Sequence, residues 1–253
     1  MENQESRNFG VVGQQLSHSF SPGYFQEKFV REHILNATYQ KFELAQASQI
    51  KELFQKDPHL IGVNVTIPYK ESVMPLLDNI SEEALTIGAV NTIKKEGDEL
   101  VGYNTDAFGF ANSIKPFLAS HHERALIFGN GGAAKAVKHV LNQLGITFLS
   151  VVRQLTENTD NQVTYTALTQ EGIRQFPLLI NTTPVGTYPN DNEVLPIPLE
   201  GIGNMHLCYD LIYNPPKTQF LAQAELRGAK TINGLSMLKL QAEKSWEIWN
   251  KTH

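Results

Sequence analysis

A glycine-rich segment near the middle of the chain has the residue types that bind a dinucleotide. Residues 129–133 read Gly-Asn-Gly-Gly-Ala, after an apolar run and before a segment with one apolar helical face. Glycines let the backbone turn sharply and let a pyrophosphate approach the N–H groups at a helix start, where the helix dipole favours negative charge. Glycines also close ordinary loops, so it is the flanking strand, helix and second strand that favour dinucleotide binding.

The end of the next predicted strand distinguishes the two nicotinamide cofactors. A carboxylate there accepts the ribose hydroxyls of NAD, whereas an arginine pairs with the additional phosphate of NADP. This chain has Arg153 at that place, 24 positions beyond Gly129, and no carboxylate before Glu157. We therefore predict NADP, with NAD as the alternative cofactor and a solvated surface arginine as the structural explanation.

Two serines, Ser19 and Ser21, follow the first predicted strand. In an extended segment their hydroxyls would point to the same side and hold a small carboxylate. Alternatively, Ser21 caps a helix that begins at Pro22. Both interpretations hold if Ser19 binds the ligand and Ser21 caps the helix.

A lysine and an aspartate stand at the ends of two further strands. Lys70 begins a predicted helix, where the helix dipole disfavours a cation by roughly 0.3–1 kcal/mol, and an unfavourable local choice indicates function. Asp106 also follows a strand, where α/β proteins place ligands, although it could be only the N-cap of a helix at 107–118. An ammonium beside a carboxylate can stabilise and protonate an oxygen that gains negative charge.

The elements that position these residues follow an α/β pattern. In the first third of the chain, apolar runs at 9–13, 38–44 and 60–66 alternate with helical patterns at 20–35 and 45–55. Two further runs, at 89–94 and 99–103, flank a turn that contains Gly97. This arrangement predicts a hairpin, and therefore a mixed sheet.

The alternation starts again at Arg124. A strand at 125–128, a helix at 133–144 and a strand at 146–152 form one βαβ unit; strands at 178–181 and 207–211 and a helix at 218–227 follow. We predict an α/β protein of two domains with a cleft between them. The first domain, with the mixed sheet, would end near Tyr103, and the segments from Arg124 onward would form a second, parallel sheet.

Composition excludes several other functions. A net charge of −5 without a basic cluster argues against nucleic-acid binding, and no apolar run approaches the roughly 20 residues of a membrane span. The polar, acidic start lacks a secretory signal, which predicts a cytoplasmic protein. Cys208 has apolar neighbours and is predicted to be a buried strand residue, while Trp246 and Trp249 are predicted to pack in the core. No metal site is predicted.

Eight segments, taken in order, resemble the shikimate dehydrogenase family over nearly the whole chain. They are HSFSP at 18–22, NVTIPYK at 64–70, GAVNT at 88–92, YNTDAFG at 103–109, GNGGAAKA at 129–136, NTTPVG at 181–186, YDLIYNPPKTQFL at 209–221 and NGLSMLKLQA at 233–242. Such an ordered series is far more specific than the glycine turn, which unrelated dehydrogenases share.

The resemblance implies that residues 1–103 and 236–253 form a mixed-sheet domain that binds the substrate, and residues 104–235 a Rossmann-type, doubly wound nucleotide-binding domain. It also implies NADPH-dependent reduction of 3-dehydroshikimate to shikimate, a step of chorismate and aromatic amino-acid biosynthesis. It implies Lys70 and Asp106 as the catalytic pair. The implied substrate-binding residues are Ser19, Ser21, Thr66, Lys70, Asn91, Asp106, Tyr213 and Gln241. The implied cofactor-binding residues are Glu82, Gly129, Asn130, Gly131, Gly132, Ala133, Arg153, Thr182, Leu211 and Gly234.

Some residues depart from the pattern of the family. Many relatives have a further arginine near the position of Arg153, Asn130 replaces a small residue of the glycine turn, and Thr187 stands where methionine is frequent. The alternatives are a sister enzyme that oxidises quinate or shikimate with NAD, and a non-catalytic sensor of shikimate or dinucleotide. The sequence leaves open whether the chain is a monomer or a homodimer.

Overall fold

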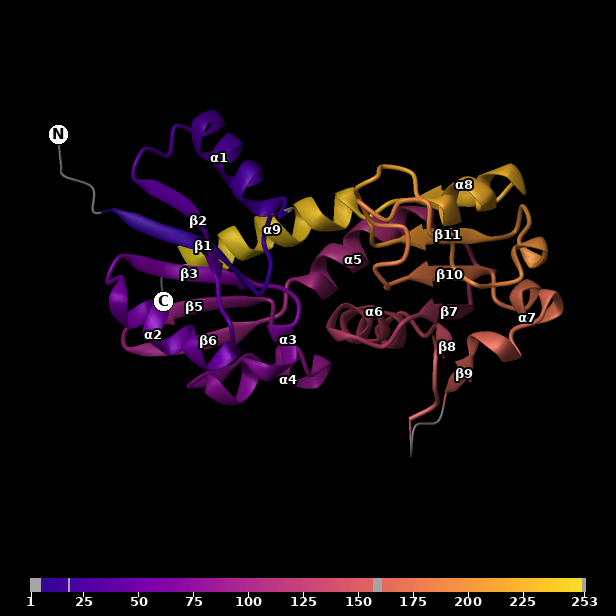
Figure 1. Cartoon of the computed structure of the whole chain (residues 1–253), viewed down its shortest axis with the longest axis horizontal. Coiled ribbons are helices and arrows are strands. Elements are labelled where there is room, and N and C mark those ends of the chain that lie inside the picture. The colour runs from indigo at the N-terminus through magenta and orange to yellow at the C-terminus, as the bar shows by residue number, and fades with distance from the viewer. Residues whose placement is uncertain (1–5, 18, 157–160, 252–253) are drawn as a thin grey trace. The chain divides into compact units, whose positions relative to one another are not determined.

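The computed structural model describes residues 6–17, 19–156 and 161–251, and the chain divides into two compact units (Figure 1). Unit 1 comprises Met1–Thr105 and Ala242–His253, and unit 2 comprises Asp106–Gln241. Each unit contains its own six-stranded sheet with helices packed against it. The prediction of an α/β fold with a mixed sheet followed by a Rossmann-type parallel sheet is confirmed.

The sheet of unit 1 has the strand order β2-β1-β3-β5-β6-β4. Its strands are β1 (Arg7–Gly13), β2 (Ala37–Glu43), β3 (Leu60–Val65), β4 (Asn79–Ile80), β5 (Thr92–Glu96) and β6 (Glu99–Tyr103). The first three are parallel, whereas β5 runs antiparallel to both β3 and β6. The predicted hairpin is therefore present, and Gly97 takes the positive φ of 62° that its turn requires.

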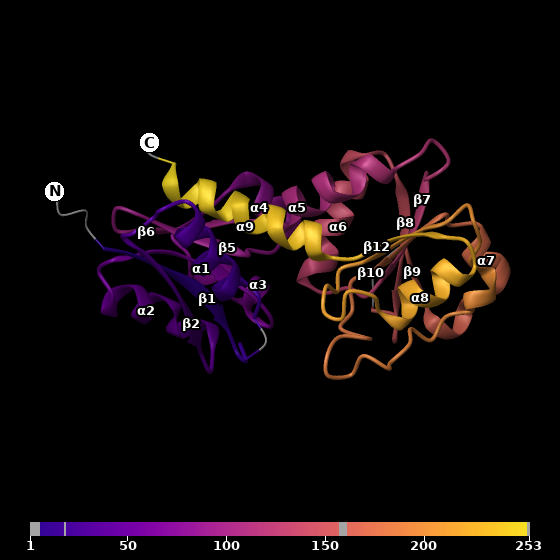
Figure 2. The same ribbon diagram turned by 90° about the horizontal axis from the view of Figure 1, so that it is seen from above.

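The helices of unit 1 cover both faces of this sheet (Figures 1 and 2). They are α1 (Ser21–Arg31), η1 (Ala47–Gln49), α2 (Ile50–Lys56), α3 (Tyr69–Ser72), η2 (Met74–Leu76), α4 (Glu82–Ile87) and the C-terminal part of α9 (Leu235–Asn250). Ile50 and Phe54 of α2 and Ala84 of α4 belong to the core of one face. On the other face, Phe25 of α1 and Trp249 of α9 pack against Phe9 of β1.

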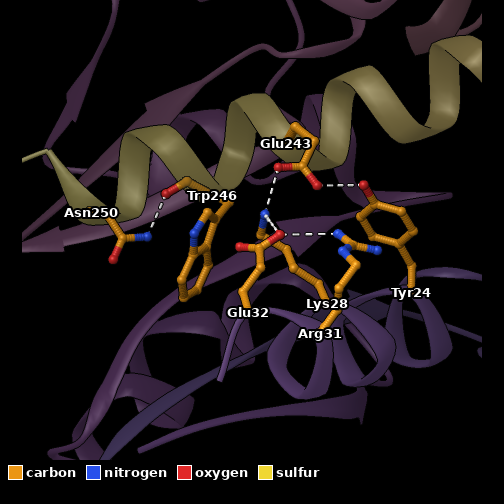
Figure 3. A network of polar contacts seen from close by, with 7 residues as sticks. All are labelled: Tyr24, Lys28, Arg31, Glu32, Glu243, Trp246 and Asn250. Atoms are coloured by element: carbon orange, nitrogen blue, oxygen red, sulfur yellow. Dashed lines mark hydrogen bonds and ion pairs between the residues drawn. The ribbon is translucent and has the colours of Figure 1, made fainter. Parts of the chain in front are cut away.

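Polar contacts also join α1 to α9 within unit 1 (Figure 3). Glu243 of α9 accepts hydrogen bonds from the Tyr24 hydroxyl and from the Lys28 ammonium, the latter at 2.7 Å. Lys28 is buried and forms a second ion pair with Glu32 at 2.9 Å. Trp246 covers the same ammonium with its ring at 5.9 Å. This buried charge is paired and hydrogen-bonded, so the contact specifies how α9 lies on α1.

The sheet of unit 2 is parallel throughout, in the order β12-β11-β10-β7-β8-β9. Its strands are β7 (Arg124–Phe128), β8 (Thr147–Val152), β9 (Gln162–Thr164), β10 (Leu178–Asn181), β11 (Leu207–Asp210) and β12 (Lys230–Ile232). Its helices are α5 (Asp106–Ile114), η3 (Lys115–Phe117), α6 (Gly132–Gln143), η4 (Tyr165–Ala167), α7 (Gln170–Arg174), η5 (Leu199–Gly201), α8 (Gln219–Leu226) and the start of α9.

Alternate residues of β11 show how the two faces of this sheet are covered. Tyr209 contacts α5, with its ring 5.2 Å from that of Phe110 and its hydroxyl 2.7 Å from the Ser113 hydroxyl. The neighbouring Cys208 belongs to the core on the other face, together with residues of α7 and α8. Cys208 is thus the buried strand residue that the sequence predicts, and burial raises the pKa of its thiol.

Some local predictions were wrong. The short elements β4, α4, β9, α7 and β12 were not predicted, because runs of two to six residues carry too little periodicity. The helix expected at 45–55 begins instead as the 3₁₀ turn η1 and becomes α-helical only at Ile50. In the part of the chain that the structure describes, no helix combines the length and apolarity of a membrane span.

Candidate active site

The polar residues predicted in the first domain gather along one edge of the sheet of unit 1, the edge formed by the carboxyl ends of β1 and β3. Because β1 and β3 are parallel, both end at this edge, where Val12 pairs with Val65. The antiparallel β5 begins there, with Thr92 opposite Asn64 of β3 and opposite Tyr103 at the end of β6. The mixed sheet therefore brings together segments that lie far apart in the sequence.

Lys70 is tied to this edge through its backbone. Its carbonyl accepts a hydrogen bond from the Val90 N–H at 2.7 Å. Because Val90 immediately precedes Asn91, this bond holds α3 next to Asn91. Thr66 is fixed to the end of β1, since its N–H donates to the Val12 carbonyl at 2.9 Å. The predicted helix at Lys70 is only the four residues of α3, so the unfavourable helix dipole is weaker than we expected.

Asn91 connects this edge to the start of α5. Its side-chain oxygen accepts from the Thr105 N–H at 2.7 Å, and its amide donates to the Thr105 hydroxyl at 3.0 Å. Thr105 immediately precedes Asp106, the first residue of α5. Asp106 is therefore the first residue of the helix rather than its N-cap, a position where a carboxylate also stabilises the helix dipole. One N–H of the Asn91 amide is not used in these bonds and can donate to a ligand.

A buried network that the sequence did not predict extends from Asn91. Asn64, which is 6% exposed, donates to the Ser245 hydroxyl of α9 at 2.9 Å and accepts from the Tyr39 hydroxyl at 2.8 Å. Ser245 in turn contacts the hydroxyls of Thr92 at 2.8 Å and of Thr105 at 3.2 Å. Each buried polar group thus has a partner, so the network holds the strand ends in one arrangement.

The structure corrects the expectation for the two serines. Phe20 has helical dihedrals (φ −71°, ψ −39°), so the segment from Ser19 to Ser21 is not extended. Nor is Ser21 the N-cap, because α1 begins at Ser21 and Phe20 occupies the cap position without a side-chain hydrogen bond. Ser21 instead lies close to the Tyr39 hydroxyl, on which it acts to lower the pKa, although burial raises that pKa more strongly.

Replacing Tyr39 with phenylalanine tests this network. The change leaves the side-chain oxygen of Asn64 without its donor, and an unsatisfied buried polar group costs about 1–3 kcal/mol. We expect urea unfolding to show a loss of that size. Tyr103→Phe is the control, because its hydroxyl bonds only to Glu96 near the sheet edge, where water can replace it. Equal losses in the two variants would contradict a special role for the Tyr39 contact.

In unit 2, the predicted glycine turn has the geometry of an anion cradle. Gly129 has a φ of 108°, and an added Cβ would lie 2.7 Å from the Thr182 hydroxyl. Gly131 has an ordinary φ of −83°, and a Cβ added there would meet no heavy atom within 4 Å, so packing within the protein does not require a glycine. The approach of a ligand to the start of α6 does require one, and these residues therefore fit a dinucleotide pyrophosphate.

The other predicted cofactor residues of unit 2 lie at the same edge of the parallel sheet. Thr182 follows β10 and its hydroxyl donates to the Phe128 carbonyl at 2.7 Å, while Leu211 follows β11 and its N–H donates to the Asn181 carbonyl at 3.0 Å. Gly234 packs on Leu211 so closely that an added Cβ would lie 1.9 Å from the Leu211 carbonyl oxygen. Arg153 follows β8 at this edge as well.

A buried carboxylate that the sequence did not predict holds these strand ends. Asp210 is fully buried and accepts from the Asn181 amide at 3.0 Å, the Ile212 N–H at 3.0 Å and the Thr218 hydroxyl at 2.6 Å. Burial raises the pKa of Asp210 to about 6, although these three hydrogen bonds oppose the shift. The ionised form is therefore disfavoured in the folded chain.

The stability of the chain should depend on pH through Asp210. Its pKa in the folded chain lies above the ordinary value, so burying the charge reduces stability above pH ~6, and protonation relieves this cost as the pH falls toward ~4. Asp210→Asn removes the titration. In urea unfolding, we expect the free energy of unfolding of the variant minus that of the parent to increase by about 1–3 kcal/mol from pH ~4.5 to pH ~7. A difference that does not vary with pH would contradict this assignment.

The remaining predicted residues are placed as follows. Gln241 is buried on α9 and packs against α5. Its contact on α5 is Gly109, one turn after Asp106, where an added Cβ would lie 3.1 Å from the Gln241 Cβ. Tyr213 lies in the segment that follows β11. Glu82 is exposed at the first position of α4 in unit 1, where an acidic residue also stabilises the helix dipole.

Comparison with known proteins gives consistent similarities along the chain. The family model of the shikimate dehydrogenase substrate binding domain matches residues 11–93. A shikimate dehydrogenase (NADP(+)) of Caldicellulosiruptor saccharolyticus is 38% identical over 260 residues, which cover 94% of this chain and 90% of that protein. The crystal structure of shikimate dehydrogenase 1 from Peptoclostridium difficile is 37% identical, with a TM-score of 0.84 over 98% of this chain and 92% of the other. Shikimate 5-dehydrogenase of Thermus thermophilus, solved with NADP(H) and shikimate, is 30% identical, with a TM-score of 0.82 over 96% and 93% of the two chains.

Proposed function

This chain belongs to the shikimate dehydrogenase family, and on that premise we propose which of its residues carry out the reaction. The reaction is the reversible, NADPH-dependent reduction of 3-dehydroshikimate to shikimate in the biosynthesis of aromatic amino acids. The observation that most supports the assignment of residues is the gathering of Thr66, Lys70 and Asn91 at one edge of the mixed sheet. Unit 1 would bind the substrate and unit 2 the dinucleotide.

We propose that the substrate lies at this edge of unit 1. Ser19 and Ser21 would hold its carboxylate, while Thr66, Asn91, Tyr213 and Gln241 would contact the ring oxygens. The Ser21 hydroxyl has a single hydrogen, which it would donate to the substrate carboxylate.

Lys70 and Asp106 would carry the proton transfer. Bound NADPH supplies the hydride that reduces the ketone. As the ketone oxygen gains negative charge, the Lys70 ammonium stabilises it and donates a proton, and the Asp106 carboxylate orients that ammonium. In the direction of shikimate oxidation, Lys70 accepts the proton of the alcohol. Both groups are needed in the same bound complex, because a misplaced donor forfeits most of the rate gain.

The dinucleotide would be bound at the carboxyl edge of the sheet of unit 2. Gly129, Asn130, Gly131, Gly132 and Ala133 would contact the pyrophosphate and Arg153 the additional phosphate of NADP. Thr182, Leu211 and Gly234 would line the nicotinamide end, and Glu82 is a further candidate from unit 1. Open backbone at Gly131, together with the positive end of α6, supports the pyrophosphate site.

A spectrophotometric assay tests the function against its alternatives. With shikimate and quinate each measured against NADP and NAD, we expect shikimate with NADP to give the highest kcat/KM. A kcat/KM ratio near one for NADP over NAD would refute the cofactor preference, and higher activity on quinate with NAD would favour the sister enzyme. Binding of shikimate without any turnover would instead indicate a sensor. We further propose that the enzyme acts in the cytoplasm, as its composition suggests.

A further inference from the structure

One lysine near the glycine turn has no negatively charged partner in the described part of the chain. The Lys138 ammonium, on α6, donates a hydrogen bond to the side-chain oxygen of Asn130, the second residue of the turn. None of the ion pairs between described residues includes Lys138. The side chain is half-buried, and that burial together with the nearby Lys135 lowers the pKa of Lys138.

This arrangement is costly unless something binds to it. A cation that is partly removed from water, close to a second cation and bonded only to a neutral amide loses solvation without a charged partner. Lys135 and Lys138 also lie one helical turn apart, where like charges destabilise a helix. An anion at this place would satisfy the Lys138 ammonium, and Asn130 would hold the ammonium in position before the anion arrives.

The sheet register relates Arg153 to Asn130, the residue that accepts the hydrogen bond from Lys138. Strand β7 pairs with β8 so that Phe128 lies opposite Val151, and the Gly129 N–H donates to the Val151 carbonyl at 3.0 Å. Asn130 and Arg153 both stand two residues beyond that pair, after the ends of two neighbouring strands. The Lys138 ammonium, which is bonded to Asn130, and Arg153 therefore belong to adjacent segments at the carboxyl end of the sheet.

We infer that Lys138, positioned by Asn130, acts with Arg153 to bind the 2′-phosphate of NADP and thereby determines the cofactor preference of this chain. A phosphate monoester carries about −1.5 to −2 charges at pH 7, which one arginine does not balance. This inference rests on the proposed NADP site. It also accounts for the lack of a second arginine after Arg153, because α6 supplies the second cation from another direction.

Isothermal titration calorimetry of the full chain with 2′,5′-ADP and with 5′-AMP tests the inference. The two probes differ only by the 2′-phosphate. For Lys138→Gln we expect affinity for 2′,5′-ADP to fall about tenfold, as for loss of one charged hydrogen bond, with affinity for 5′-AMP changed less than about twofold. Lys138→Arg should retain most of the affinity, and Asn130→Ala should lose part of it.

Lys230→Gln is the matched control. It removes the same charge from unit 2, but Lys230 begins β12 and stands at the opposite edge of the parallel sheet, over the Phe117 ring. We expect its affinities to equal those of the parent. Equal losses for both probes in Lys138→Gln would place the lysine on the pyrophosphate instead and overturn the inference.

The failure of this inference can be told apart from failure of the NADP assignment. If Arg153→Gln weakens 2′,5′-ADP binding but Lys138→Gln does not, the inference is wrong while the NADP site stands. If the parent chain itself binds 2′,5′-ADP no better than 5′-AMP, the NADP preference fails and the inference fails with it.

Discussion

Replacing Lys70 with alanine is expected to reduce turnover by about two to four orders of magnitude, the usual contribution of a positioned proton donor. The backbone of Lys70, rather than its side chain, makes the hydrogen bond to Val90, so the sheet edge should remain intact. The loss should appear in kcat for shikimate oxidation at saturating NADP. Dinucleotide affinity, measured by calorimetry, should be unchanged because the glycine turn belongs to the other unit.

Lys51→Ala provides the control for this variant. Lys51 also belongs to unit 1, but it is exposed and forms a surface ion pair with Asp78 at 2.9 Å. Surface pairs of this kind contribute about 0–1 kcal/mol, so stability and turnover should stay near those of the parent. If Lys70→Ala retained near-normal turnover, Lys70 would not be the proton donor.

Replacing Gly234 with alanine should destabilise the chain strongly. The new Cβ would lie 1.9 Å from the Leu211 carbonyl oxygen, a backbone atom that cannot move aside without displacing the segment after β11. Overpacking of this kind costs typically about 1–3 kcal/mol and sometimes more. We expect thermal unfolding to show a lower melting temperature, together with weaker dinucleotide binding.

Gly131→Ala should have the opposite pattern and serves as the comparison. Its Cβ meets no heavy atom within 4 Å and its backbone already has a φ of −83°, so the free energy of unfolding should change little. Dinucleotide affinity should fall nevertheless, because the Cβ occupies the space through which a pyrophosphate approaches α6. Unchanged affinity would contradict the placement of the pyrophosphate at this turn.

Local sequence was sufficient for several features of the site. The glycine turn was predictable because strand, turn and helix are consecutive and each depends on neighbouring residues alone. Lys70 and Asp106 were also predictable as candidates, since each follows a strand where α/β proteins place ligands. The predictions of a helix at Lys70 and of an N-cap at Asp106 were less accurate. A shift of one or two residues in a helix boundary is enough to change a cap into a helical position.

Contacts between distant residues were not predictable from the sequence. Asn64 meets Ser245 across 181 positions, and Tyr39 reaches Asn64 only because β2 and β3 flank β1. The Lys138 contact is nearer in sequence, but the glycine turn must be folded before Asn130 faces α6. Such contacts depend on packing and on sheet register, which residue types do not specify.

The α/β fold, the glycine turn and the family could be read from the sequence, because periodicity, turn chemistry and ordered motifs depend on residues that are neighbours in the chain. Tertiary structure alone decided which hydroxyls and amides join into the buried network around Asn64, and that Asp210 is a desolvated carboxylate. It also decided that Lys138 stands close to the glycine turn without a carboxylate among the described residues. The physical reason is that solvation and hydrogen-bond partners are properties of the packed chain, not of the residues alone.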